Sequence, residues 1–335
     1  SDLKGCWNMK RVSLLLLLPL LLQPLHAQAV VEKPRCLLLY SYHAGYAWND
    51  GVDEGATRTL ADHCTIRRFY LDSKRNPDPK TIRSKVDEVM GVVMAWQPDV
   101  MIAVDDNASK YVVAPYFKGS DTPVVFCGVN WTAESYGYPY RNVTGMVEVA
   151  PIDALLEQTA EAMRPLLQER SFNQIKAHFI DADRLSARKI FAYFKRAFDQ
   201  RGITLEPHFV DDFDAWKSAY QHAQRDDLIL LINHAGIEDW DQQAAQQFVE
   251  QEGKTFSVTN HDWMRSLVAM TVAKVPQEQG EWAAAAAIKI LQGSPISGIP
   301  ITRNRQMIRF INPRLLSRVG VSLPQSLLDG ARVVR

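Results

Sequence analysis

The sequence lacks an excess of charge of either sign. Among its 335 residues, Lys and Arg together number 38, and Asp and Glu together also number 38. Proteins that bind nucleic acid usually carry a strongly basic face, so this balance argues against nucleic acid as a partner. Hydrophobic residues make up 47% and charged residues 23%, a composition typical of a globular protein with ample material for a core.

The common nucleotide and hydrolase motifs are also missing. The turn after the first expected strand has no G-x-G-x-x-G, and the chain contains neither G-x-x-x-x-G-K-[ST] nor G-x-S-x-G. These absences argue against a dinucleotide site, a P-loop and an α/β-hydrolase. His234 and His261 lie in different loops without metal-binding spacing, so we expect them to donate hydrogen bonds rather than to hold a metal. We therefore expect no enzyme activity, no cofactor and no metal.

The N-terminus has the layout of a secretory signal peptide. A basic pair at 10–11 precedes an apolar run over residues 12–22, and the small-residue motif AQA follows at 27–29. The run is too short and too interrupted for a comfortable membrane span. We expect cleavage after Ala29 and export to the periplasm of a Gram-negative cell. The residues before Met9 are expected to be an upstream extension or to reflect a misplaced start.

The chain has only four cysteines, of which Cys6 precedes the predicted cleavage site. The three that remain allow at most one bridge within the chain. Cys36 and Cys64 open the first two expected strands, and neighbouring parallel strands would place them at the same level, near the 5.5–6 Å Cα separation of a disulfide. Cys127 is expected to be a buried thiol. The alternative, that all three are buried thiols, stays open.

From residue 35 onward, short apolar runs alternate with amphipathic stretches. This alternation is typical of parallel sheets covered by helices on both faces, and it restarts near residue 150. The fold class expected is α/β, with two doubly wound parallel-sheet lobes joined by a hinge. Strands are expected over 35–41, 64–72, 99–105, 122–130, 174–181, 203–210, 227–233 and 255–260. Helices are expected over 49–62, 78–97, 107–117, 152–167, 184–201, 213–224 and 239–252.

Polar and aromatic residues follow strand after strand. The first strand is followed by SYHAGYAWND at 41–50, and the third and fourth by DDNAS at 105–109 and NWTAESYGYPY at 130–140. Doubly wound sheets bind ligands at the carboxyl ends of their strands, so these segments predict a binding cleft between the lobes. Some of the rings are expected only to close the junction between loop and sheet. The second lobe has DADR, NHAG and NHDW in equivalent places.

The segment AMTVAKVPQEQGEWAAAAAIKILQGSPISGIPI at 269–301 resembles the returning crossover of type I periplasmic binding proteins. The stretches YLDSKRNPD, PDVMIAVDDNAS, TPVVFCGVNW, NVTGMVE and INPRLLSRVGVSLP extend the resemblance over about 33–330. Together they are similar to the ABC-transporter substrate-binding family, whose members also serve as extracellular input domains of bacterial sensors. The resemblance implies reversible capture of a small molecule between two lobes that close about a hinge.

The resemblance also implies a set of ligand-facing residues. If Asp105 or Asp106 faces the cleft rather than capping the next helix, the ligand should carry an amine or several hydroxyls. The first-lobe candidates are Tyr42, His43, Tyr46, Trp48, Asp105, Asp106, Asn107, Asn130 and Trp131. The second-lobe candidates are Asp181, Arg184, Asn233, His234 and Asn260.

The expected domain organisation has four parts. Residues 1–29 are the extension and signal peptide, 30–148 with 276–293 the first lobe, 149–275 with 300–312 the second lobe, and 313–335 a tail. The leading hypothesis is a periplasmic solute-binding protein that delivers an amino acid, amine, sugar or related solute to an ABC permease. The alternative is a ligand-sensing protein that signals to a membrane histidine kinase or cyclic-dinucleotide enzyme. A periplasmic enzyme would need a catalytic constellation, and no convincing spacing indicates one.

Overall fold

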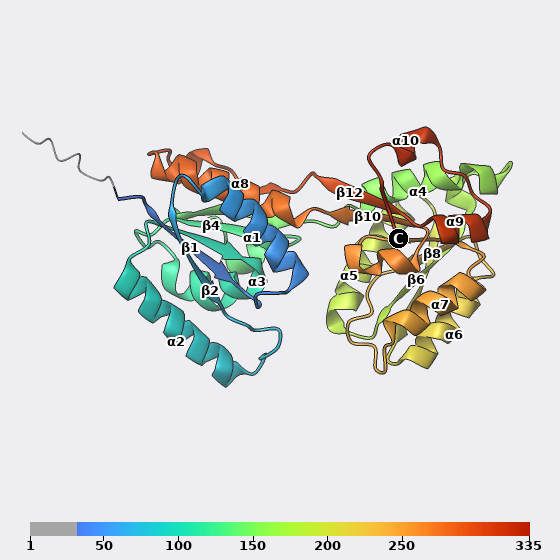
Figure 1. Ribbon diagram of the computed structural model, residues 1–335, viewed down its shortest axis with the longest axis horizontal. Coiled ribbons are helices and arrows are strands. Elements are labelled where there is room, and N and C mark those ends of the chain that lie inside the picture. The colour runs from blue at the N-terminus through green and yellow to red at the C-terminus, as the bar shows by residue number, and fades with distance from the viewer. Residues whose placement is uncertain (1–31) are drawn as a thin grey trace, which may run out of the picture. The chain divides into compact units, whose positions relative to one another are not determined.

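The protein has two α/β lobes, each built around its own sheet (Figure 1). The structure is a computed structural model, and it describes residues 32–335. The predicted signal peptide and its cleavage site after Ala29 lie outside the described residues. Between 32 and 335, no helix combines the length and apolar character needed to cross a membrane.

The first sheet has six strands in the order β11-β5-β4-β3-β1-β2, and all of its pairs are parallel. Alternate side chains of β1 point to opposite faces, so Leu37 and Leu39 pack toward α2, whereas Leu38 and Tyr40 pack toward α1 and α8. The strands are β1 (Arg35–Tyr40), β2 (Thr65–Tyr70), β3 (Val100–Val104), β4 (Val124–Asn130), β5 (Val143–Glu148) and β11 (Thr302–Arg303). The helices are α1 (Ala47–Leu60), α2 (Pro79–Trp96), α3 (Asp105–Ala108), which continues as a π-helix over Ser109–Phe117, and α8 (Pro276–Leu291).

The second sheet has seven strands in the order β13-β12-β10-β9-β8-β6-β7. All of its pairs are parallel except β10 with β12. The strands are β6 (Lys176–Ala182), β7 (Thr204–Val210), β8 (Leu228–Leu231), β9 (Phe256–Thr259), β10 (Met270–Lys274), β12 (Met307–Ile311) and β13 (Arg332–Val333). The helices are α4 (Ile152–Leu167), α5 (Leu185–Asp199), α6 (Phe213–Ala223), α7 (Gln242–Glu252), α9 (Pro313–Val319) and α10 (Gln325–Leu328).

The predicted fold class, two doubly wound α/β lobes, is confirmed, but two segments lie elsewhere than expected. Thr302–Arg303, assigned to the second lobe, pairs with β5 in the first sheet. Residues 313–335, expected to be a tail, belong to the second lobe, because Leu315 and Leu327 are buried in its core and β13 pairs with β12. An apolar pattern does not decide which sheet a segment joins.

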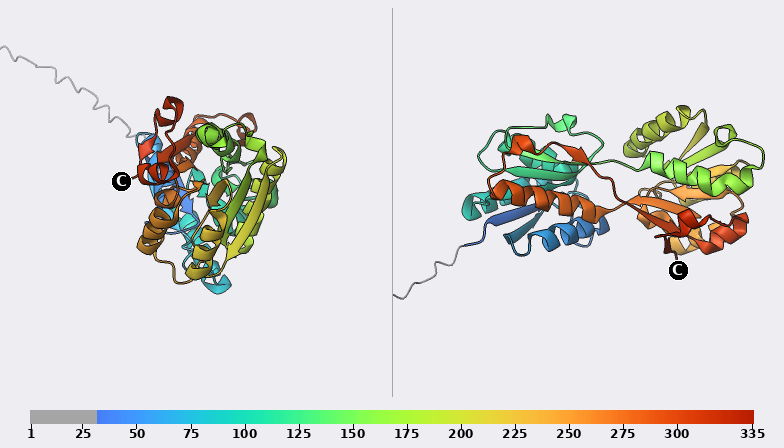
Figure 2. Two further views of the ribbon diagram at one scale, coloured as in Figure 1. Left: turned by 90° about the vertical axis from the view of Figure 1, so that its right-hand side faces the viewer. Right: turned by 90° about the horizontal axis from the view of Figure 1, so that it is seen from above.

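The chain crosses between the lobes three times, after β5, after β10 and after β11 (Figures 1 and 2). The crossings are bonded to one another. Asn304 accepts from the backbone N–H of Val149 at 2.7 Å and donates to the carbonyl of Val149 at 3.1 Å. The carboxylate of Glu278 accepts from the backbone N–H groups of Arg305 at 2.8 Å and Gln306 at 2.9 Å. These bonds tie the three connections into one unit at the carboxyl ends of the strands.

Cys36 and Cys64 are joined by a disulfide in the structure, with their Cα atoms 5.8 Å apart. Cys64 lies one residue before β2, and the register pairs Cys36 with Ile66, so the bridge links the starts of two adjacent parallel strands. Cys127 is a buried free thiol. The bridge closes a loop with a sequence separation of 28 residues, which in the chain-entropy model stabilises the fold by roughly 3–4 kcal/mol.

A chain that begins at residue 30 should therefore contain one free thiol when it is unfolded without reductant, and three after reduction. Thiol titration in denaturant measures both numbers. Three free thiols before reduction would show that Cys36 and Cys64 are not bridged. The Cys127→Ser variant is the matched control, because it should lower each count by one without changing the difference of two.

Candidate functional site

A cavity of about 1260 Å³ lies where the loops after the strands of both sheets meet. Its first-lobe wall comes from the turn after β1, the ends of β3 and β4, and the start of α8. Its second-lobe wall comes from α5 and from the loops after β8 and β9. Eight of the fourteen predicted ligand-facing residues line it: Tyr42, Tyr46, Trp48, Asp105, Asn130, Trp131, Asn233 and Asn260.

Asp105 is the most unusual polar group of the cavity wall. It follows β3 directly with a left-handed backbone (φ 68°), and it is almost fully buried. Trp48 Nε1 donates to its Oδ1 at 2.9 Å, whereas its Oδ2 has no hydrogen-bond partner among residues 32–335. Burial raises the pKa of the Asp105 carboxyl to about 8. A buried carboxyl oxygen without a donor is costly, so this atom is suited to meet a donor from a bound molecule.

The neighbouring backbone leaves no spare room around this carboxyl. Gly128 on β4 has φ 71°, and a Cβ atom added there would lie 2.4 Å from Asp105 Oδ1. The backbone N–H of Gly128 donates to the buried side-chain amide of Gln279 on α8 at 2.9 Å. The Asp105 side chain is therefore held between β4 and Trp48 and has little freedom to turn away from the cavity.

Glu148, the last residue of β5, and Lys274, the last residue of β10, form an ion pair where the chain crosses between the lobes. Lys274 Nζ donates to Glu148 Oε1, and it also lies 5.1 Å from the centroid of the Trp48 ring. Both residues line the cavity. Burial lowers the pKa of the Lys274 ammonium to about 8. The ammonium of Lys274 also acts on the Asp105 carboxyl through space, whereas its contact at hydrogen-bond distance is with Glu148.

Aromatic rings stand on both walls. On the first lobe, Tyr42 and Tyr46 meet edge to face with centroids 5.2 Å apart, next to Trp48. On the second lobe, His261 and Trp263 stack at 4.2 Å, and Trp263 is 41% exposed. Flat rings on two sides of a cavity, beside placed polar groups such as Asp105, are typical of a site for a small molecule.

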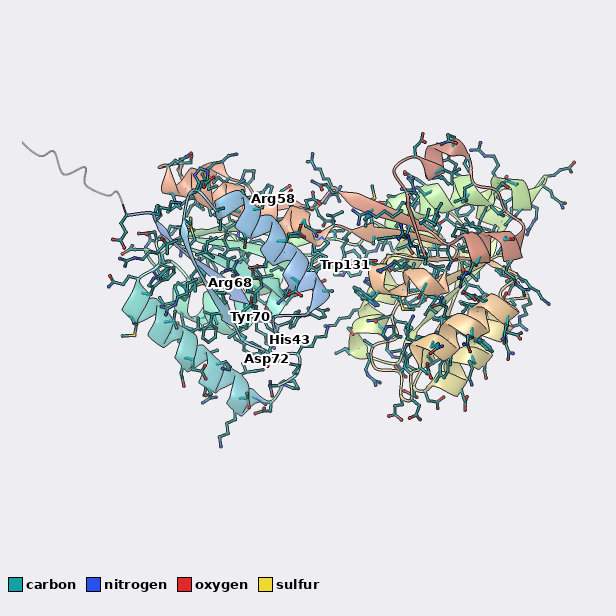
Figure 3. The ribbon with its side chains drawn as sticks, in the orientation of Figure 1. His43, Arg58, Arg68, Tyr70, Asp72 and Trp131 are labelled. Carbon is teal, nitrogen blue, oxygen red and sulfur yellow. A yellow bond between two sulfur atoms is a disulfide. The ribbon has the colours of Figure 1, made fainter. Side chains whose placement is uncertain are left out.

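Trp131 joins the lobes directly. It follows β4 of the first lobe with a left-handed backbone (φ 65°), and its ring stacks on Tyr193 of α5 in the second lobe at a centroid distance of 3.8 Å (Figure 3). Its backbone N–H donates to the carbonyl of Glu148 at 2.9 Å. The ring thus covers one side of the cavity and contacts the opposite lobe.

A family model described as ABC transporter substrate binding protein matches residues 83–335. The chain belongs to this family. Among proteins with curated descriptions, none matches the chain significantly.

Solved structures of substrate-binding proteins share this fold at low sequence identity. One, an ABC domain in complex with L-Trp from Streptococcus pneumonia, is 16% identical and has a TM-score of 0.58, over 89% of this chain and 99% of that one. The ligand-free, open structure of a substrate-binding protein with adhesive properties from Clostridium difficile is 12% identical and has a TM-score of 0.67. The match covers 90% of this chain and 99% of that one. A periplasmic ribose ABC transporter structure from Conexibacter woesei is 14% identical and has a TM-score of 0.57. The match covers 90% of this chain and 96% of that one.

Six of the predicted ligand-facing residues do not line the cavity of this substrate-binding protein. His43 Nδ1 lies 3.6 Å from the carboxylate of Asp72, beyond the aromatic turn (Figure 3). Asn107 donates to Ser73 Oγ at 2.8 Å. Both side chains therefore brace the loops behind the cavity wall.

Asp106 points away from its neighbour Asp105. Its carboxylate accepts from Asn130 Nδ2 at 2.6 Å and from the Tyr136 hydroxyl at 2.7 Å, and it lines a second cavity that adjoins the first at Asn130 and Trp131. Both oxygens are thus used within the first lobe. Of the two adjacent carboxylates, only Asp105 reaches the large cavity.

In the second lobe, three predicted residues stabilise loops. The ring of His234 stacks on Trp240 at 4.9 Å. The guanidinium of Arg184 donates to the carbonyl of Gly236. Asp181 is buried under the sheet edge and accepts from the backbone N–H of the next residue at 2.8 Å, and burial raises the pKa of its carboxyl to about 7.

The cavity-lining residues that the prediction did not select include Glu148, Lys274, His261 and Trp263. His261 and Trp263 stand in the segment NHDW, which the sequence placed at the right edge of the sheet. Glu148 and Lys274 end strands that lead into crossings. Their signal was a charged residue at the end of an otherwise apolar strand, a feature that solvent-exposed strand ends also show.

Proposed function

We propose that the cavity captures a small solute that carries a primary amine on a flat apolar framework, and that the protein delivers this solute to an ABC importer. The observation that carries the proposal is Asp105, a buried cavity-lining carboxyl whose Oδ2 lacks a donor. An ammonium group offers three donors and the opposite charge, so it satisfies this oxygen better than a neutral hydroxyl does.

The charges and rings around Asp105 support the same ligand class. Glu148 pairs with Lys274, whereas Oδ2 of the Asp105 carboxyl keeps its capacity to accept from a positively charged donor. The rings of Tyr46, Trp48 and Trp263 favour a planar apolar group beside the amine. Aromatic amino acids and aromatic amines combine both features, and L-Trp in one solved relative makes them the first compounds to test.

Capture would proceed by movement of the lobes about the three bonded crossings. Such closure would bring the rings of both walls onto the ligand and exclude water from Asp105. The predicted signal peptide would place this cycle in the periplasm, after cleavage following Ala29. Release to a membrane permease then requires only that the lobes reopen.

A thermal-shift screen with matched pairs of compounds tests the ligand class. L-Trp and tryptamine carry the amine, whereas indole-3-propionate has a similar ring without it. We expect an amine-bearing compound to raise the melting temperature by several degrees at about 100 times its Kd, because it binds only the folded state. We expect its deaminated partner to give no shift. D-ribose and D-arabinose serve as hydroxyl-rich comparisons, and shifts from sugars alone would contradict the proposal.

A further inference from the structure

A cluster of imidazoles lies on the second lobe, away from the cavity. His178 on β6 pairs in register with Glu206 on β7, and His208 stands two residues further along β7, so all three side chains share one face of the sheet. Helix α6 packs against β6 and β7 and contributes His222 from its last turn. The ligand atoms of the four residues all lie within 4.8 Å of one another.

The separations between these atoms fit a tetrahedral metal ion. His178 Nδ1 and His208 Nε2 are 2.9 Å apart, and Glu206 Oε1 lies 3.7 Å from His208 Nε2 and 3.6 Å from His222 Nε2. Bonds of about 2.0–2.1 Å in a tetrahedron place the ligand atoms about 3.3 Å from one another. The measured distances lie on both sides of this value, so small side-chain adjustments would complete the geometry.

A second carboxylate fixes the orientation of the buried ring. Asp226 Oδ2 lies 2.8 Å from His178 Nε2. This contact holds the proton on Nε2 and directs the lone pair of Nδ1 into the cluster, the arrangement that carboxylates impose on metal-binding histidines.

We infer that His178, Glu206, His208 and His222 form a binding site for a divalent transition metal of the Zn²⁺ class. Three imidazole nitrogens and one carboxylate oxygen match the donors that zinc prefers, and four protein ligands leave no open position for chemistry. The ion would therefore fasten the edge strand β7 to β6 and α6. The guanidinium of Arg225 contacts His222 Nε2, but its exposed side chain is free to turn away when a metal binds.

The site is distinct from the solute cavity. The cavity is lined by residues that follow the carboxyl ends of strands, whereas His178 and Glu206 are the third residues of their strands. His222 and Asp226 flank the end of α6, which runs back to the amino ends of the strands. Metal binding and solute binding can thus be measured independently.

Calorimetric titration of untagged protein, stripped with EDTA and then dialysed, with ZnCl₂ at pH 7.5 tests the inference. We expect one Zn²⁺ per chain and a rise in melting temperature of about 5 °C at 100 times the Kd. His208→Gln and His222→Ala should each weaken Zn²⁺ binding at least about 100-fold, and Asp226→Asn about 10–100-fold. His63→Ala, which removes an exposed histidine outside the cluster, should bind like wild type.

Two results would overturn the inference. One is wild-type protein that binds no Zn²⁺, which would leave a cluster held only by hydrogen bonds between its rings. The other is a stoichiometric site whose affinity is the same in His208→Gln, His222→Ala and wild type, which would place the ion elsewhere. His222 is partly exposed, so its replacement should leave the lobe folded, and circular dichroism checks this.

Discussion

Replacing Asp105 with Asn should weaken binding of the amine identified in the screen at least about 100-fold. The substitution removes the charge opposite the ammonium group, and losing one member of a buried charged pair typically costs 2–5 kcal/mol. Asn retains a carbonyl oxygen that can accept from Trp48 Nε1, and it tolerates the left-handed backbone of this position. The variant should therefore fold normally, so that calorimetry reports the lost charge.

The pH dependence of the same binding provides a second measurement. The pKa of Asp105 is raised to about 8 in the unliganded protein, so below pH 8 this carboxyl must lose a proton before it pairs with an ammonium. The affinity of wild type should thus rise about tenfold per pH unit from pH 6 to 7 and level off near pH 8. Lys274 and Glu148 also face the cavity, but the ammonium of Lys274 stays largely charged over pH 6–7.

The matched control is Asp106→Asn, because the Asp106 carboxylate is bonded to Asn130 and Tyr136 and lines the other cavity. The affinity of the Asp106→Asn variant for the amine should differ from that of wild type by less than about threefold, and it should rise with pH as in wild type. The affinity of the Asp105→Asn variant should not rise with pH. Equal affinities for wild type and both variants would remove Asp105 from the binding site and with it the proposed ligand class.

Most of the fold could be predicted from the sequence because buried parallel strands are continuous apolar runs. MIAV in β3 and LILL in β8 are such runs, and helices have clear boundaries at residues such as Asp78 and Asp212, whose side chains cap α2 and α6. The sequence could not show which lobe the segments after α8 join. Each adds to a sheet at an edge strand that is still unpaired, and an apolar pattern does not identify that edge.

The site could be predicted only in part. A strand end identifies the edge of the sheet, so the turns with Trp48, Asp105 and Asn260 were placed correctly at the cavity. Which of the two adjacent carboxylates, Asp105 or Asp106, faces the large cavity depends on the backbone conformation at Asp105. The left-handed φ at Asp105 sends that side chain toward Trp48 and leaves Asp106 in the other cavity. The side chains of His178 and His222 come together only because of the strand register and the packing of α6 on the sheet. Their separation in the sequence therefore does not indicate the cluster.

Helix α8 returns from the second lobe and lies beside α1 (Figure 2), where glycines allow the two backbones to approach closely. A Cβ atom added at Gly280 would lie 2.0 Å from the carbonyl oxygen of Val52 and 2.7 Å from the nitrogen of Ala56. These are backbone atoms of a buried helix, so they cannot rotate aside, and α8 would have to shift. Since Pro276 and Gln277 at the start of α8 line the cavity, this close approach also positions part of its wall.

Gly280→Ala should therefore lower the free energy of unfolding by about 2 kcal/mol or more, even though Ala favours a helix over Gly by about 1 kcal/mol. Gly91→Ala is the matched control, because Gly91 lies inside α2 and a Cβ atom there would meet nothing within 4 Å. That variant should gain about 0.5–1 kcal/mol from helix propensity alone. Urea denaturation measures both changes. Opposite signs are expected because the two sites differ in the space around the new methyl group, and a gain at Gly280 would mean that α1 and α8 are not packed this closely.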